Sequence, residues 1–404
     1  MNKKLIALAV AGLFAAPAVA FAQSTSSVTI YGVMKMSLDQ ASATGASGVG
    51  TNSPNRGRVS NHSSRIGFKG SEDLGDGISA MFQAEFGISS DVAGSSTTNA
   101  IPTALPATAT AATQNALSGR NTAIGLTSKT MGTVLVGIWD TPYKTSTGNY
   151  DYFIDTVADY NAIISATPGN SYDLRGNNVV AYVSPDMSGF VGKVAYAFGE
   201  NIPVSGAAPT AANPDSKVIS LSGNYDSGPM SFGLGYEKHS NMSDLGVTAA
   251  TSTSSTGLKL GGAYSFGDTK VALVWEKLKA DSNAAAVGNI SATDRKAWMI
   301  NVAHKMGSGT IKAAYTKANQ VSCSVVGGAA CTSADLGASQ VSLGYDHAMS
   351  KRTKIYGVYT AITNKNDAVK AGNAYTFASG GAGGITVAAG ADPKAISFGM
   401  EHSF

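Results

Sequence analysis

Apolar and polar residues alternate along most of this chain, and the alternation returns in segment after segment. Between residues 28 and 38 the even positions are apolar or glycine, whereas the odd positions include Thr29 and Lys35. Residues 78–88 repeat the pattern, with Gln83 and Glu85 on the second face. Successive side chains of a β-strand point to opposite faces, so a period of two predicts strands with one apolar face.

Over the whole sequence this pattern predicts sixteen strands. An even number of antiparallel strands is what a closed barrel needs when both of its chain ends lie on one side. The expected strands cover residues 28–38, 64–69, 78–88, 120–128, 132–139, 177–184, 190–200, 217–226, 229–239, 257–266, 269–279, 295–305, 309–319, 339–348, 353–362 and 394–404.

The expected connections alternate between short and long. Short turns on one side and long loops on the other are typical of outer-membrane barrels. The short connections are residues 73–77, 129–132, 185–189, 227–229, 267–268, 306–309 and 350–352. The long ones are 40–62, 90–119, 140–175, 201–216, 240–256, 280–294, 320–338 and 363–393.

The polar faces of these strands carry ionisable residues, which decides between a membrane barrel and a soluble sandwich. A dry core between two sheets would have to bury these charges at great cost. A water-filled lumen removes that cost, while the apolar faces meet lipid and closure leaves no unpaired sheet edge. We therefore predict an all-β protein, a transmembrane antiparallel β-barrel with short periplasmic turns and long external loops. The inward charges are Lys35, Arg65, Lys69, Glu85, Lys193, Lys259 and Lys312.

The first residues have the features of an export signal. Lys3 and Lys4 precede a short apolar run, and Ala20-Phe21-Ala22 is a small-x-small cleavage site. We expect a signal peptide at residues 1–22, with Ala20 as the alternative cleavage point, and one barrel domain at residues 23–404. Removal of two lysines lowers the formal charge from +3 to +1, which gives no bulk attraction to nucleic acid. No mature segment has 18 consecutive apolar residues, so helical membrane spans are not expected.

Residues 140–175 form a long connection of unusual composition. It holds five acids, two bases and six aromatic residues, and few of the small polar residues that fill a flexible tether. A long connection rich in side chains able to pack is usually functional. Val157, Asn161 and Ile164 are spaced for one face of a short helix over residues 155–164.

The chain has two cysteines, Cys323 and Cys331, around a sequence typical of a loop tip. Export permits a disulfide, and we expect these two residues to form a local one. No histidine or acid cluster accompanies them, and the five histidines have no metal-ligand spacing. We expect neither a metal site nor any other cofactor.

Several stretches resemble the general Gram-negative porins of β-proteobacterial type. Residues 27–32 (Ser-Val-Thr-Ile-Tyr-Gly) resemble their first strand, and 64–75 (Ser-Arg-Ile-Gly-Phe-Lys-Gly-Ser-Glu-Asp-Leu-Gly) their second strand and first turn. Residues 341–353 resemble a late hairpin, and 399–404 (Gly-Met-Glu-His-Ser-Phe) the C-terminal strand. The resemblance covers the whole mature chain and is specific in combination.

The resemblance implies a sixteen-stranded homotrimeric channel in the outer membrane. It also implies that the barrel-insertion machinery reads Phe404, that loop 140–175 folds inward and narrows the pore, and that Arg65 belongs to a basic wall opposite. Such porins often carry charged residues beside this loop where this chain has Ile138, Ala181 and Val183. That difference leaves the sign of the selectivity open.

The expected function is passive diffusion of small hydrophilic solutes and ions across the outer membrane. Constriction width and lining charge would set what passes. Two alternatives remain: a structural or adhesive barrel whose external loops are the working surface, and an outer-membrane hydrolase. No nucleophile elbow with a recognisable triad and no phosphate-binding loop supports an enzyme. The candidate pore residues are Lys35, Arg65, Lys69 and Glu85 on the wall and Asp151, Asp155 and Asp159 on the loop.

Overall fold

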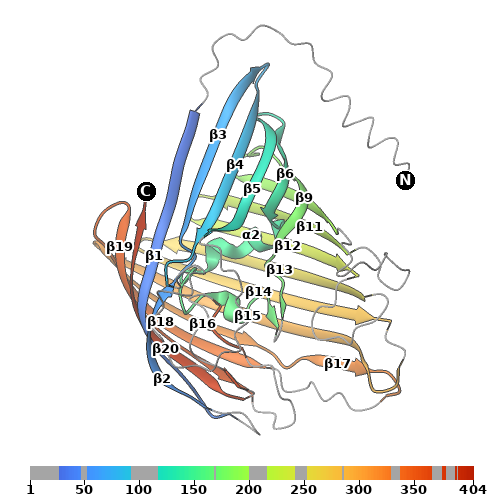
Figure 1. The fold of residues 1–404 in the computed structure, drawn as a ribbon, viewed down its shortest axis with the longest axis vertical. Coiled ribbons are helices and arrows are strands. Elements are labelled where there is room, and N and C mark those ends of the chain that lie inside the picture. Colours follow the sequence, from blue (N-terminus) through green and yellow to red (C-terminus); the bar gives the residue numbers. More distant parts are fainter. Residues whose placement is uncertain are drawn as a thin grey trace, which may run out of the picture.

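The computed structural model describes residues 27–46, 52–91, 117–167, 170–199, 216–241, 253–283, 286–328, 337–365, 375–378, 387–388 and 390–404. Its strands curve into a closed wall around the segment that follows β6 (Figure 1). The wall consists of β1 (Ser27–Thr44), β2 (Ser53–Asn61), β3 (Arg65–Gly75), β4 (Ile78–Ile88), β5 (Leu117–Ser128), β6 (Gly132–Asp140), β9 (Arg175–Val183), β10 (Phe190–Phe198), β11 (Lys217–Ser227), β12 (Met230–Ser240), β13 (Thr253–Phe266), β14 (Thr269–Ser282), β15 (Ile290–Met306), β16 (Gly309–Ala318), β17 (Ser322–Val325), β18 (Ala338–Ala348), β19 (Thr353–Asn364) and β20 (Asp392–Ser403).

These eighteen segments make the sixteen strands that the sequence predicts. β2 and β3 both pair with β1, along its second and first halves, so together they occupy one place in the wall. β16 and β17 share one place beside β15 in the same way. Antiparallel pairing of β1 with β20 closes the barrel. Gly32 and Phe404 exchange two backbone hydrogen bonds of 3.1 Å at this seam, and a Cβ on Gly32 would lie 2.4 Å from the Phe404 ring.

Several of the long connections are shorter than predicted, four of them markedly so. β1 continues to Thr44 and β2 begins at Ser53, so most of residues 40–62 is strand. The connections predicted at 240–256, 280–294 and 320–338 are shortened likewise by β13, β14, β15 and β17. The strands extend beyond the residues that alternate between apolar and polar. Backbone hydrogen bonding between strands can continue there, because an apolar outer face is needed only in the band that contacts lipid.

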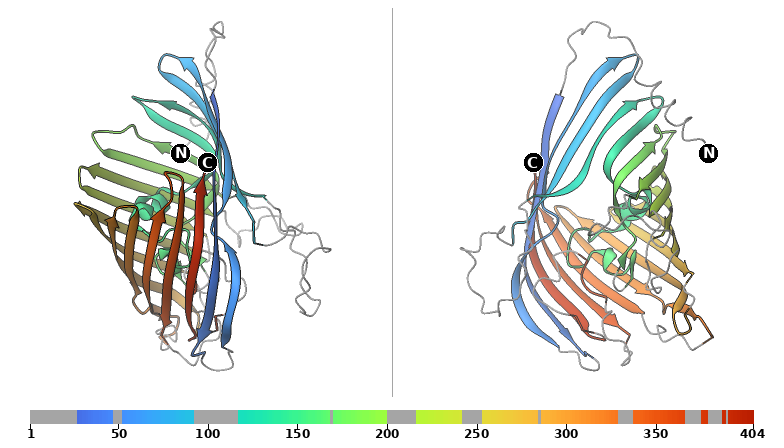
Figure 2. Two further views of the ribbon diagram at one scale, coloured as in Figure 1. Left: turned by 90° about the vertical axis from the view of Figure 1, so that its left-hand side faces the viewer. Right: turned by 45° about the vertical axis from the view of Figure 1, so that its right-hand side comes forward.

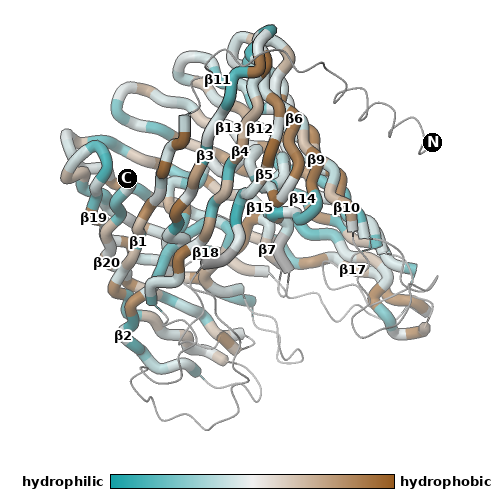
Figure 3. Tube along the Cα trace, turned by 45° about the horizontal axis from the view of Figure 1, so that its top comes forward, coloured by the Kyte–Doolittle hydropathy of each residue, from teal (hydrophilic) through white to brown (hydrophobic). Residues whose placement is uncertain are grey.

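The two faces of the wall differ as the alternation predicts. Along β12, Met230, Phe232, Leu234 and Tyr236 are each 37–53% exposed, while Glu237 is buried inside. Hydrophobic residues recur along the strands around the wall (Figure 3). Among the described residues, none of the helices has the length and apolar character needed to cross a bilayer.

The short turns lie at one end of the barrel, beside the C-terminus (Figure 2). Glycines with positive φ make several of them, including Gly77 at 74° and Gly267 at 61°. Cys323, in β17, is disulfide-bonded. Its expected partner Cys331 and the expected signal peptide lie outside the described residues.

Candidate functional site: the loop inside the barrel

The segment between β6 and β9 folds into the barrel (Figures 1 and 2). It contains helix α2 (Pro142–Thr147), the 3₁₀ turns η1 (Gly148–Tyr150) and η2 (Tyr160–Ala162), and the small hairpin β7 (Ala166–Thr167) and β8 (Asn170–Ser171). Thr141 caps α2 by accepting a hydrogen bond from the Lys144 amide, and Pro142 begins the helix. The helix predicted over residues 155–164 was wrong, because Asp155 has a φ of 54° and only η2 is helical there.

Inward-facing glycines of the wall make room for this loop. A Cβ on Gly261 of β13 would lie 2.5 Å from the Tyr150 ring, and one on Gly257 would lie 2.6 Å from the Tyr172 ring. The loop therefore packs directly on the wall backbone at these positions, where any larger residue would displace it.

A buried carboxylate on the wall fastens the middle of the loop. Glu276 of β14 accepts hydrogen bonds from the Tyr143 hydroxyl at 2.8 Å, the Ser165 amide at 2.9 Å and the Ser165 hydroxyl at 3.0 Å. It also pairs with Arg295 at 3.1 Å, and Arg295 donates to the Ile163 carbonyl. Burial, followed by the nearby carboxylate of Glu276, raises the pKa of the Tyr143 phenol well above its usual range.

A buried lysine holds the end of the loop. Lys259 of β13 pairs with Asp173 and lies 4.3 Å from the centre of the Tyr143 ring. Tyr172 stacks on His239, with ring centroids 4.2 Å apart and planes within 10°. These contacts fix the returning half of the loop against β12 and β13.

The tip of the loop reaches across to the seam strands. Lys312 of β16 donates to the Tyr152 carbonyl, and Lys35 of β1 to the Ile154 carbonyl, both at 2.8 Å. Asp155 extends further and meets Arg65 of β3 at 3.5 Å. The tip is therefore held by strands on both sides of the β1–β20 seam.

The other two candidate loop acids point into the loop. Asp151 accepts from the Phe153 and Tyr160 amides, and Asp159 from the Asp155 and Asn161 amides, at 2.8–2.9 Å. Each residue is 5% exposed. Burial raises the pKa of the Asp151 carboxyl to about 6, and burial followed by the neighbouring Asp151 raises the pKa of Asp159 well above its usual range.

The wall candidates belong to two ion-pair networks. In the first, Glu85 of β4 accepts from Arg120 of β5 at 2.6 Å and from the Tyr31 hydroxyl at 3.0 Å, with Arg65 at 4.0 Å. Lys69 lies beside this network, 5.2 Å from the centre of the Tyr31 ring. Arg65 and Asp155 join it to the loop.

The second network crosses the seam with alternating charge. Lys35 pairs with Glu401 at 3.1 Å, Glu401 with Lys354 at 3.2 Å, Lys354 with Asp346 at 3.6 Å, and Asp346 with Lys312 at 2.9 Å. With Arg65, Asp155 and the tip of the loop, these side chains line an internal cavity of about 230 Å³.

Charged residues also gather where the loop leaves the wall. Asp140 pairs with Lys144 at 2.8 Å and with Arg175 at 3.1 Å, and Asn121 bonds to both Asp140 and Arg175. Nearby, Ala181 is 4% exposed and packs in an apolar cluster with Leu135 and Val179. This is one of the positions at which the porins that the sequence resembles often carry a charged residue.

The sequence reasoning missed several of these network members. Arg120 stood at the edge of a predicted strand, and Asp346, Lys354 and Glu401 lay on predicted strands whose ionisable residues were not among the candidates. These residues fall at the alternate strand positions whose side chains face the lumen, and that spacing could have identified them. Among the described residues there is no group of three or more potential metal ligands.

The structure is that of a membrane-spanning channel. It combines a closed antiparallel barrel, an apolar outer face, ion-pair networks on the inner wall and a loop packed inside. The comparisons with known proteins then give the family. The family model described as "Gram-negative porin" matches residues 7–367. The chain belongs to this family, and it is a diffusion porin of the outer membrane.

One relative and two solved structures of the same fold illustrate the similarity. The "Outer membrane porin protein 32" of Delftia acidovorans is 27% identical over 413 residues, covering both chains completely. The structure of the anion-selective porin from Comamonas acidovorans superposes with a TM-score of 0.67 at 23% identity, over 94% of this chain and all of the other. The trimer form of in-vitro folded OmpT from Vibrio cholerae superposes with a TM-score of 0.61 at 16% identity, over 94% of this chain and 99% of the other.

Proposed function

We propose that solutes pass between the tip of loop 140–175 and the wall formed by β3, β4 and β5. The observation that carries this assignment is the position of the tip, which Lys312, Lys35 and Arg65 hold against strands of the wall. Arg65, Lys69 and Glu85 then face the narrow part from the wall, and Asp155 faces it from the loop. Bases on one side and an acid on the other produce a transverse field, which favours polar solutes over apolar ones.

Asp151 and Asp159 act differently in this proposal. Their carboxylates hold backbone amides of the loop, so they keep the tip in shape instead of touching the solute. Lys35 likewise acts partly through its bond to the Ile154 carbonyl.

The lining charge supports a preference for anions. The two wall networks, Lys69 and the Asp140–Lys144–Arg175 group together carry a net charge of +3. Their eight bases are Lys35, Arg65, Lys69, Arg120, Lys144, Arg175, Lys312 and Lys354, and their five acids are Glu85, Asp140, Asp155, Asp346 and Glu401. A positive lining raises the local concentration of anions and lowers that of cations. The anion-selective porin named above is a relative of the same fold.

Planar-bilayer recording of the purified protein tests the proposal. We expect stable ohmic channels that open in steps of three, because the chain is proposed to assemble as a homotrimer, as the OmpT relative does. In a salt gradient the reversal potential is expected on the anion-selective side. A reversal potential on the cation-selective side would refute the charge argument, and absence of channels would refute the pore. Insertion through Phe404 is tested separately, by the yield of assembled barrel after removal of that residue.

Shortening the loop tests the constriction separately. Deletion of residues 150–160 removes the tip and its bonds to Lys35 and Lys312. We expect a larger conductance and a larger solute cutoff. An unchanged cutoff in a correctly assembled barrel would show that the narrow part lies elsewhere.

A further inference from the structure

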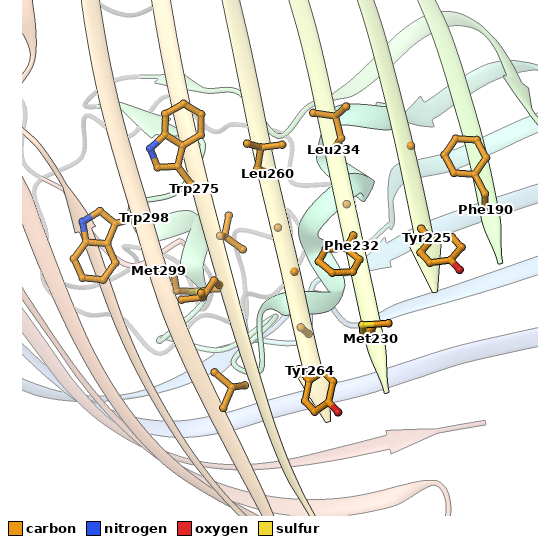
Figure 4. Close-up of a pocket in the computed structure, with 18 residues that line it drawn as sticks. Phe190, Tyr225, Met230, Phe232, Leu234, Leu260, Tyr264, Trp275, Trp298 and Met299 are labelled. Carbon is orange, nitrogen blue, oxygen red and sulfur yellow. The ribbon is translucent and has the colours of Figure 1, made fainter. Parts of the chain in front are cut away.

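The outer face of the barrel has an open apolar recess over β10 to β15. Figure 4 shows its lining, in which aromatic and aliphatic side chains surround the recess and the strands form its floor. Its volume is about 750 Å³, within the range of roughly 300–1,000 Å³ that is usual for small-ligand sites. The recess is therefore large enough to hold a molecule in its own right.

Two outward-facing glycines create the recess. Gly223 of β11 lies opposite Leu234 of β12, and Gly262 of β13 lies between Phe232 and Leu273. The Phe190 ring lies over Gly223 and the Phe232 ring lies over Gly262, because a Cβ at these positions would be 3.1 and 3.2 Å from the two rings. In both rows a ring packed against the strand thus takes the place of a side chain that would stand out from the wall, so the surface is lower there.

The recess lies in the half of the wall near the short turns. Met230 begins β12, and Tyr264 is two residues from the end of β13. The Tyr225 and Tyr264 hydroxyls point toward the strand ends (Figure 4). Just beyond Tyr264, Thr269 and His304 form an exposed polar pair at 2.9 Å. Since short turns are periplasmic in such barrels, the recess opens to the periplasmic leaflet with a polar edge at headgroup level.

The length of the recess matches one leaflet. Val271 lies in the Tyr264 row and Trp275 in the Leu260 row, four residues apart, which is about 13 Å along a strand. Half of the hydrocarbon core of a bilayer is about 15 Å. An extended chain that enters past Tyr264 would thus run up to Trp275 and Trp298.

We propose that this recess binds an acyl chain of one glycerophospholipid of the periplasmic leaflet. The lining supplies apolar contact on several sides, which a lipid on the plain convex wall does not receive. The Tyr225 and Tyr264 hydroxyls and the Thr269–His304 pair meet the polar part of the same lipid. This site is on the outside of the barrel, so it does not depend on the pore assignment.

The tryptophans of the chain allow a direct test. There are three, of which Trp275 and Trp298 line the recess, whereas Trp139 packs against a buried cluster away from it. A Trp139→Phe protein therefore reports on the recess alone. In detergent, dibrominated phosphatidylcholine is titrated against its tryptophan fluorescence. We expect quenching that saturates at one lipid per chain.

The matched control carries a single tryptophan on the plain outer wall. It combines Trp139→Phe, Trp275→Phe and Trp298→Phe with Ile124→Trp, a β5 position that is 63% exposed. We expect quenching there to rise with lipid without saturation, with half-effect at a concentration about tenfold higher or more. Two filling variants, Gly262→Leu and Gly223→Leu, are each expected to abolish the saturable phase in the Trp139→Phe protein.

Three results would overturn the proposal. The recess and control reporters could respond alike, which would mean ordinary annular lipid. A filling variant that assembles normally could keep the saturable phase. The recess tryptophans could also be shielded from every lipid in the assembled oligomer, which would assign the recess to a second copy of the chain.

Discussion

The buried carboxylate of Glu276 is one of the groups that hold the loop inside the barrel, and Glu276→Gln tests its contribution. The substitution keeps the size of the side chain but replaces a charged acceptor oxygen by an NH₂ donor. Ser165 and Tyr143 together direct three hydrogen-bond donors at this carboxylate, and Arg295, which is 2% exposed, loses its only ion-pair partner among the described residues. The loop should therefore dock less firmly on β14 and β15.

The size of the effect follows from the burial of both charges. Removing one partner of a buried, hydrogen-bonded ion pair costs about 3–5 kcal/mol. At about 1.4 kcal/mol for each factor of ten, the ratio of docked to undocked loop falls by roughly two to three and a half orders of magnitude. The barrel wall itself keeps its backbone pairing, so the channel is expected to assemble.

Single-channel recording measures this change. We expect larger open-channel current noise and a higher mean conductance for Glu276→Gln than for the unmodified protein. Asp294→Asn is the matched control, since its ion pair with Lys277 is about one-third exposed and such pairs contribute only about 0–1 kcal/mol. If Glu276→Gln and Asp294→Asn gave the same noise and conductance, the loop would be held by something other than Glu276.

Three further predictions concern charge, pH and space. Arg65→Glu should move the reversal potential toward cations in a salt gradient, whereas Arg56→Glu, an exposed residue of β2, should not; equal shifts would place Arg65 outside the narrow part. The pKa of the Asp151 carboxyl is about 6 in the folded loop, higher than the value of about 4 in an unfolded chain. The protonated carboxyl therefore stabilises the packing of the loop, and this stabilisation is lost as the pH rises from about 4 to 6. Channel noise should therefore be lower at pH 4 than at pH 7, and Asp151→Asn should weaken this dependence; a steeper dependence in that variant would contradict the assignment. Gly261→Leu should push Tyr150 off β13 and raise the conductance, while Gly57→Ala, in β2 with open space around it, should leave the conductance unchanged.

The barrel could be predicted from the sequence because its determinants are local. Alternation with a period of two marks each strand, and the same pattern decides which residues meet lipid and which meet water. Arg65, Lys69 and Glu85 were found on this basis. Strand ends were less predictable, as β1, β2 and β15 show, because pairing continues beyond the apolar band.

Only the tertiary structure decided how the inner charges are used. Asp151, Asp155 and Asp159 look alike in the sequence, yet two of them cap amides inside the loop and one meets Arg65. The sequence places Lys259 and Glu276 on the inner face of the barrel like many other polar residues. They are buried because the loop packs over them. The order of residues determines the face on which a side chain lies. Its neighbours come from strands and a loop distant in the chain, so closure and the path of the loop determine which charges pair, which are buried and which remain beside water.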